Sequence, residues 1–202
     1  SETLKRSSSQ LYLQLLTIGD TNIFYNYEYN WKKSHLEYQF KDFINHFLRV
    51  SGKPLSFLDF NLSYKFGKDI AYREIIPQLG YETNINFDIE FAINNNLRVK
   101  PIISYQDIRK DDSNGYYFKG YIGRLDVRYQ FNNNLDIRLI SEYNDFSEQV
   151  FLQPLISWRP NPDTIFYLGG NQNYINNFID YNSPYYRVNK TQLFLKFQYL
   201  IK

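Results

Sequence analysis

The stretch that decides the fold is YIGRLDVRYQFNNNLDIRLISEY, residues 121–143. On both sides of its three asparagines, apolar and polar residues alternate. Successive side chains of a β-strand point to opposite faces, so this pattern predicts two strands that each have one apolar and one polar face. The asparagines at 132–134 predict a tight turn between them, because asparagine tolerates left-handed backbone better than most residues.

The same two-residue period runs through residues 23–31, 58–66, 85–93 and 97–105. None of the residues on the apolar parity of these segments is charged, whereas about half of those on the other parity are. Tight turns are predicted at 94–96, 132–134 and 159–163, and longer polar loops at 109–116 and 171–190. Alternating short and long connections predict an antiparallel up-and-down order of about twelve strands. We expect strands near residues 10–18, 21–31, 35–49, 56–66, 70–79, 84–93, 97–108, 117–131, 135–146, 149–159, 164–174 and 190–201.

One of these segments admits a second interpretation. Residues 36–50 keep a strand parity except at Asp42 and His46. Residues 40–48 also fit the apolar stripe of an amphipathic helix, with Phe40, Phe43 and Ile44 on it. Of the two interpretations, the strand is favoured.

The composition excludes several classes of protein. Tyr 20, Phe 17 and Trp 2 give 19% aromatic residues in a chain of 202 with a mean hydropathy of −0.53. Disordered chains are poor in aromatics, and a helical membrane protein needs about 20 consecutive apolar residues. A net charge of +2 argues against a nucleic-acid partner. The chain has no Cys and therefore no disulfides, and the absence of Met indicates a mature product or a piece of a longer polypeptide.

The number of large apolar residues decides which way the apolar face points. The interior of a small soluble barrel holds only a modest set of side chains, fewer than these segments carry. The apolar parity is therefore predicted to face lipid, in an antiparallel up-and-down transmembrane β-barrel of a bacterial outer membrane. Residues 1–202 would form this single domain, or the C-terminal portion of a larger barrel, in contact with the lipid bilayer and lipopolysaccharide. Aromatic side chains expected at the membrane interface are Tyr25, Tyr27, Tyr29, Trp31, Tyr143, Trp158 and Tyr199.

The C-terminal half resembles a known family. Its motifs are RLDVRYQF (124–131), LDIRLISEYN (135–144), PLISWRPNP (154–162) and FYLG (166–169), followed by a final amphipathic strand in residues 192–202. These motifs resemble the C-terminal outer-membrane barrel of an uncharacterised Bacteroidetes family. Members of that family usually carry an N-terminal module similar to family-9 carbohydrate-binding modules, which this chain lacks. The resemblance implies an outer-membrane location, glycan handling and a longer parent protein.

Charged residues share the polar parity of four consecutive predicted strands. They are Asp88, Glu90, Arg98, Lys100, Arg124, Asp126, Arg128, Arg138 and Glu142. Charges on neighbouring antiparallel strands fall opposite or diagonal to one another, so they could form a lattice of ion pairs across a barrel interior. They could equally form a charged pore lining that selects solutes.

The sequence favours a protein without enzymatic activity, cofactor or metal. His46 with Asp42 is a candidate for a hydrolase at the barrel rim, but the pair is more simply explained as interfacial residues. Asp111 and Asp112 lack the alternating spacing of a calcium loop. We therefore expect a channel or transport component for small polar solutes or glycans. The alternative is a plugged barrel that anchors a surface module or another outer-membrane or surface protein.

Overall fold

The computed structural model describes residues 6–17, 20–35, 37–111, 114–177 and 185–200, and most of them belong to strands. The strands are β1 (Arg6–Thr17), β2 (Thr21–His35), β3 (Tyr38–Phe40), β4 (Phe43–Leu55), β5 (Leu58–Ala71), β6 (Gln78–Ala92), β7 (Leu97–Lys110), β8 (Tyr116–Asn132), β9 (Leu135–Asn144), β10 (Gln149–Asn161), β11 (Thr164–Asn177) and β12 (Tyr185–Tyr199). No helix in these ranges is long and apolar enough to cross a membrane. The all-β prediction is confirmed.

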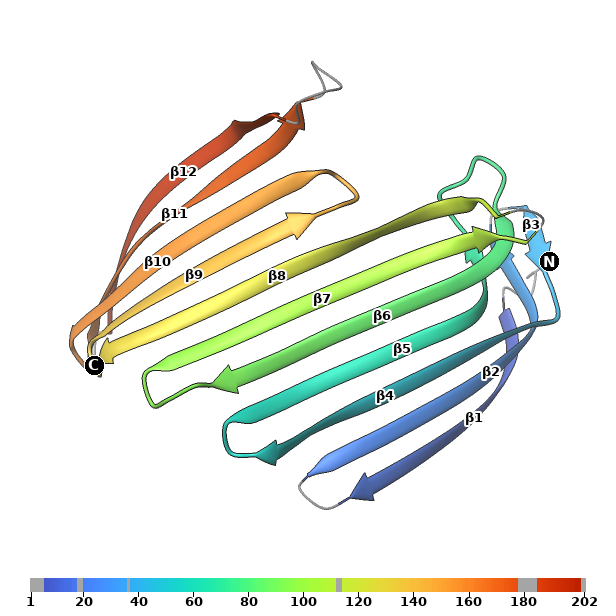
Figure 1. Cartoon of the computed structure of the whole chain (residues 1–202), viewed down its shortest axis with the longest axis horizontal. Helices are drawn as coiled ribbons and strands as arrows, with labels where there is room; N and C mark the ends of the chain where they lie inside the picture. Colours follow the sequence, from blue (N-terminus) through green and yellow to red (C-terminus); the bar gives the residue numbers. More distant parts are fainter. Residues whose placement is uncertain (1–5, 18–19, 36, 112–113, 178–184, 201–202) are drawn as a thin grey trace. The chain divides into compact units, whose positions relative to one another are not determined.

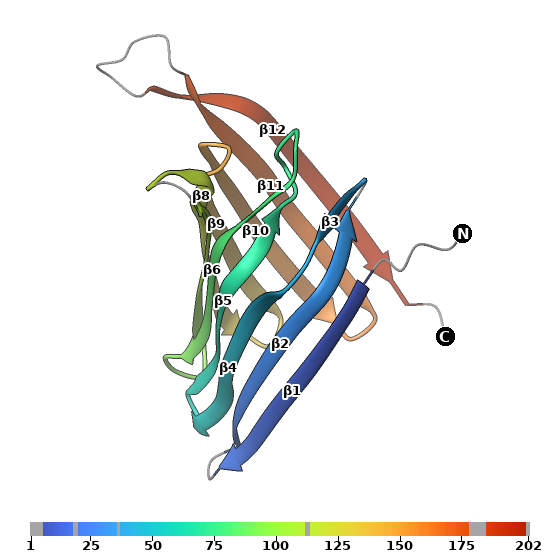
Figure 2. The same ribbon diagram turned by 90° about the vertical axis from the view of Figure 1, so that its right-hand side faces the viewer.

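The strands form one twelve-stranded sheet in the order β1-β2-β4-β5-β6-β7-β8-β9-β10-β11-β12, with β3 paired to β2. Each strand of this path lies beside its neighbour in sequence, which confirms the antiparallel up-and-down order. Figure 1 shows hairpins joining successive strands, and Figure 2 shows β1, β2 and β4 side by side. The chain divides into two compact units, unit 1 (residues 1–55, 59–88 and 104–121) and unit 2 (residues 56–58, 89–103 and 122–202).

The three predicted tight turns are present, but the reason given for them is wrong. In the first, Asn94 Oδ1 accepts hydrogen bonds from the backbone N–H groups of Asn96 and Leu97, at 2.9 and 2.8 Å. Asn132 and Asn161 close the other two turns in the same way. The asparagines act by side-chain hydrogen bonding to the backbone two or three residues on, and not by adopting left-handed backbone.

The ambiguous segment, predicted as one strand at 35–49, contributes to two strands, β3 and β4. β3 and β4 both pair with β2, and Lys33 lies opposite Phe40 while Tyr29 lies opposite Ile44. Between β3 and β4, Asp42 has a φ of 54°, and this left-handed residue interrupts the strand. The helical alternative is therefore wrong, because the cross-strand partners fix a two-residue period.

Several predicted boundaries differ from the structure, and two of the differences involve a whole segment. The separate strand expected at 70–79 does not form, since β5 continues to Ala71 and β6 begins at Gln78 after a turn. The loop expected at 171–190 is shorter, because β11 and β12 extend into it with polar residues. There, Asn171 Nδ2 donates to Gln192 Oε1 across the two strands at 2.9 Å. Polar side chains predict a loop here, but they are equally compatible with the solvent-exposed ends of long strands.

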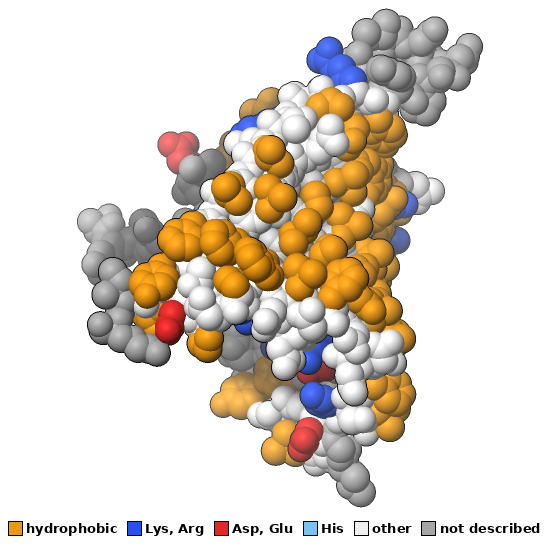
Figure 3. All heavy atoms as spheres, turned by 90° about the vertical axis from the view of Figure 1, so that its left-hand side faces the viewer, with side chains coloured by type: hydrophobic (Ala, Val, Ile, Leu, Met, Phe, Trp, Pro, Cys, Tyr) orange, Lys and Arg blue, Asp and Glu red, His pale blue; other side chains and the backbone are white. Residues whose placement is uncertain are grey.

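Large apolar side chains are exposed on every long strand, whereas few apolar side chains of the described residues are buried: Phe43, Ile70, Ala71, Pro77, Ile108 and Ile140. In unit 2 the exposed face carries an apolar row, in which each residue lies opposite the next: Tyr129, Ile137, Ile156, Leu168 and Leu195. Figure 3 shows a side of the molecule where hydrophobic side chains predominate over charged ones. Contiguous exposed apolar surface of this kind is unusual for a soluble monomer.

Candidate functional site

The candidate site is the polar face of unit 2, which is built by β8, β9 and parts of β6 and β7. Strand alternation places polar residues on this face, and the pairing of β8 with β9 sets them opposite one another. Arg124 lies opposite Glu142, and Arg128 lies opposite Arg138. Eight of the nine predicted charges belong to unit 2: Glu90, Arg98, Lys100, Arg124, Asp126, Arg128, Arg138 and Glu142. The ninth, Asp88, is on the segment of β6 that belongs to unit 1.

Arg138 and Asp126 form the strongest ion pair of this face. Arg138 Nε lies 3.0 and 3.1 Å from the two carboxylate oxygens of Asp126, and its Nη2 lies 2.5 Å from Oδ2. A guanidinium that donates to both oxygens of a carboxylate holds it in a fixed orientation. This pair therefore fixes one side of the site across β8 and β9.

Three further pairs are looser. Arg128 Nη2 lies 3.3 Å from Asp136 Oδ1, and Arg98 Nη1 lies 3.3 Å from Glu90 Oε1. Arg124 Nη1 lies 3.7 Å from a carboxylate oxygen of Glu142. Exposed pairs of this length contribute little to stability. Their main effect is to place guanidinium groups at defined points of the face.

Arg128 and Arg138 are direct cross-strand neighbours of like charge. Like charges directly opposite on adjacent strands repel and destabilise a sheet. Each arginine instead reaches diagonally to a carboxylate two residues along, Arg128 to Asp136 and Arg138 to Asp126. The two crossed pairs offset part of the repulsion and keep two guanidinium groups close together.

Two hollows adjoin on this face. The first, of about 250 Å³, is lined by Glu90, Arg98, Lys100, Asp126, Arg128 and Arg138. The second, of about 210 Å³, is lined by Asn95, Asn96, Arg98, Arg128, Gln130, Asn133, Asp136 and Arg159. Arg98 and Arg128 line both hollows. Each hollow carries two more cationic than anionic side chains.

The sequence analysis missed two charged residues of the second hollow. Asp136 is on the polar parity of β9, so the alternation alone could have identified it. Arg159 could not be placed from alternation, because it follows the strand segment that pairs regularly with β11. Its backbone N–H donates to the carbonyl oxygen of Asn134 at 2.7 Å, which brings it to the turn between β8 and β9.

Unit 1 has a polar cluster that the sequence analysis also missed. Lys65 Nζ lies 2.6 Å from Asp69 Oδ2 and also pairs with Glu82. Lys33 Nζ approaches Asp69 Oδ1 at 3.5 Å, and Gln106 donates to Glu82 at 3.0 Å. Lys65 and Glu82 are on the polar parity of their strands. The sequence analysis predicts a separate strand at 70–79, where the structure has the turn between β5 and β6, and therefore does not place the two residues on adjacent strands.

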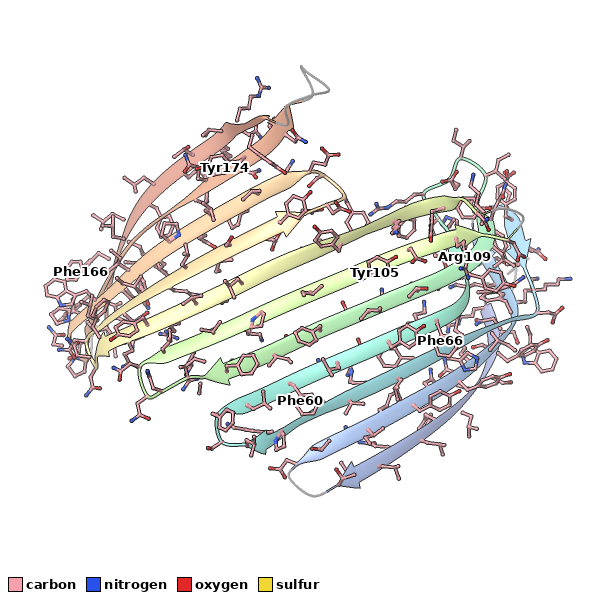
Figure 4. All side chains as sticks on the ribbon, viewed as in Figure 1. Phe60, Phe66, Tyr105, Arg109, Phe166 and Tyr174 are labelled. Carbon is pink, nitrogen blue, oxygen red and sulfur yellow. The ribbon has the colours of Figure 1, made fainter. Side chains whose placement is uncertain are left out.

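His46 and Asp42, the candidate hydrolase residues, line a separate groove of unit 1 with a volume of about 530 Å³. His46 Nδ1 is 2.8 Å from the Tyr25 hydroxyl, and its ring stacks on Phe66 at 4.6 Å between centroids. Asp42 accepts a hydrogen bond from the Tyr29 hydroxyl at 2.7 Å. Each residue of the pair is thus engaged by a tyrosine. Figure 4 labels Phe66 and Arg109, which line this groove from β5 and β7.

Cations pack on aromatic rings at the loop end of unit 1. Lys68 and Arg109 both lie over the ring of Tyr81, with cation-to-centroid distances of 5.0 and 5.8 Å. Lys68 Nζ also lies 2.7 Å from Asp111 Oδ2. This hydrogen bond lowers the pKa of the Asp111 carboxyl, which belongs to the loop after β7. Asp112, the other residue of the rejected calcium site, is outside the described residues.

The predicted interfacial aromatics divide between the two units. Four of them follow one another at two-residue spacing on β2: Tyr25, Tyr27, Tyr29 and Trp31. They span about 20 Å at the ordinary rise of a strand. The Tyr29 and Trp31 rings meet edge to face at 4.8 Å. In unit 2, Trp158 stacks on Phe166 at 5.3 Å, near the turn between β10 and β11. The remaining two residues end strands: Tyr143 is next to last in β9 and Tyr199 is last in β12.

Among the described residues, no group of three or more His, Asp or Glu side chains is arranged to hold a metal ion. Comparisons of the chain with known protein families, curated proteins and solved structures find no match. The function must therefore be argued from the two faces of the sheet.

Proposed function

We propose that the chain is a bilayer-spanning β-barrel protein of a bacterial outer membrane that passes small polar solutes along its charged face. The observation that carries this proposal is the contrast between the two faces of β8 and β9. One face bears the exposed apolar row through Tyr129 and Ile137, and the other bears the ion pairs and hollows around Arg128 and Arg138. Barrels in lipid have this arrangement, with apolar side chains outside and polar side chains within.

A single pair of substitutions on β9 tests the assignment of the faces. Leu139→Arg puts a charge on the apolar face at the middle of β9, which should cost about 2–4 kcal/mol in a bilayer. The neighbouring Arg138→Ile should be milder, because its side chain is on the polar face. Insertion into lipid vesicles is measured from the difference in gel mobility between heated and unheated samples. The opposite ranking of the two variants would show that the faces are inverted.

The same vesicles test the passage of solutes. The unmodified protein and Leu139→Ile should make vesicles permeable to arabinose, a small neutral sugar, whereas Leu139→Arg should not because it fails to insert. Vesicle swelling is the measurement, and Leu139→Ile is the conservative control.

A second candidate function is a plugged barrel that anchors a partner. It is favoured by the crossed pairs Arg128–Asp136 and Arg138–Asp126, which fill part of the polar face with side chains. Full insertion without arabinose permeability would support the anchor and contradict solute passage. Glycan handling and contact with lipopolysaccharide belong to either candidate as parts of the same proposal.

A further inference from the structure

We propose that the two hollows of unit 2 together form a binding site for small solutes that carry two carboxylate groups. This inference rests on the proposed passage of polar solutes and names their chemical class. Its physical basis is the set of arginines shared by both hollows.

The charge of the lining favours anions. The first hollow has four cationic side chains against the carboxylates of Glu90 and Asp126. The second has three arginines against the carboxylate of Asp136. Because both hollows carry excess positive charge, a ligand with one anionic group in each would be held at both ends.

The arginines keep donors available even though they are paired. A guanidinium has five N–H donors, and a single ion pair uses one or two of them. The side chain of Arg98 is 66% exposed and that of Arg128 is 52% exposed, and each makes its ion pair at 3.3 Å. A planar carboxylate matches the two parallel N–H groups of a guanidinium better than it matches an ammonium. The lining therefore suits carboxylates.

The Arg128–Arg138 pair supports the same conclusion. Two guanidinium groups opposite each other on adjacent strands repel, and the crossed pairs with Asp136 and Asp126 offset only part of this repulsion. A bound anion in the first hollow, which both residues line, would relieve that repulsion. The amides of Asn95 and Asn133 in the second hollow add neutral donors near the turns.

The size of the hollows limits the ligand. Volumes of about 250 and 210 Å³ are each below the roughly 300–1,000 Å³ that is usual for sites of drug-sized molecules. Two adjoining hollows of this size accept a short chain with a carboxylate at each end. Succinate is such a molecule and serves as the probe.

Equilibrium dialysis of the folded, detergent-solubilised protein against labelled succinate tests the proposal. We expect saturable binding that weakens at least tenfold in Arg98→Gln and in Arg128→Gln. Arg98→Lys should recover only part of the binding, because it keeps the charge and loses the two parallel donors. Lys68→Gln, which removes a cation of unit 1, is the matched control and should bind as the unmodified protein does.

Acetate and inorganic phosphate complete the design. Acetate should compete at least tenfold more weakly than succinate because it fills one hollow only. The proposal is overturned if succinate does not bind, if it binds no better than acetate, or if its binding is unchanged in Arg98→Gln. The assignment to carboxylates is overturned if phosphate competes more strongly than succinate. Arabinose permeability is a separate measurement, so failure of succinate binding with swelling intact contradicts this inference alone.

Discussion

Strand alternation places charged side chains on one face in both units, but the two clusters differ in how exposed these side chains are. In unit 1, Glu82 and Asp69 are only 5% and 12% exposed and close around Lys65. In unit 2, Arg98 and Arg128 are more than half exposed and extend into hollows. Burial makes an ion pair rigid and makes the loss of one partner costly. Exposure leaves donors for a ligand. The comparison favours a stabilising role for the charges of unit 1 and agrees with the proposed binding role for those of unit 2.

The largest effect is expected from a substitution in the cluster of Lys65, Asp69 and Glu82 in unit 1. Lys65→Gln leaves two carboxylates close together without their shared cation, and it should lower the free energy of unfolding by about 3 kcal/mol. Arg98→Gln, the matched change in unit 2, should cost at most about 1 kcal/mol because its pair is exposed. Urea unfolding in detergent is the measurement. Equal losses would mean that the two clusters do not differ in role.

An intermediate loss of stability is expected from a substitution of Gly67, which lies two residues before Asp69 on β5. Its φ of 137° is rarely adopted by residues with a side chain, and a Cβ there would collide with the carbonyl oxygen of Ile44. Gly67→Ala should therefore cost about 1–3 kcal/mol.

Gly123 on β8 provides the control for this substitution. A Cβ at Gly123 would have no atom within 4 Å, so Gly123→Ala should be neutral or slightly stabilising. Both variants are compared by urea unfolding. A neutral Gly67→Ala would show that β5 does not need this backbone bend to present Asp69.

The smallest effect is the pH dependence of the Lys68–Asp111 pair at the loop end of unit 1. The hydrogen bond from Lys68 lowers the pKa of Asp111 in the folded protein below its unfolded value of about 3.9. The pair therefore stabilises the fold above pH 4, and this contribution is lost as the pH falls through the folded pKa. Asp111→Asn should lower the urea midpoint slightly at pH 7 and have no effect at pH 2.

Lys68→Gln should abolish the same pH-dependent difference, since it removes the other partner. A difference between the unmodified protein and Asp111→Asn that persists at pH 2 would show that Asp111 acts through something other than its charge. Because Asp111 is about half exposed, the effect should also shrink at high salt.

Much of unit 2 could be predicted because its strands alternate strictly and its turns are short. Arg124, Asp126 and Arg128 follow one another at two-residue spacing, so a single register places all of them on one face. Unit 1 was predicted less well. It contains Asp42 and Gly67, whose positive φ values of 54° and 137° stand at positions that no two-residue period marks.

The sequence by itself determined the all-β class, the antiparallel order and the two chemical faces, because these depend on local alternation and on turn residues. Only the tertiary structure decided which charges meet. Arg128 lies opposite Arg138 and pairs diagonally with Asp136, and Arg159 reaches the turn at Asn134. These relations depend on the register of strands, on bulges and on turn geometry. They are set by long-range hydrogen bonds between strands, which a pattern within a single strand does not contain.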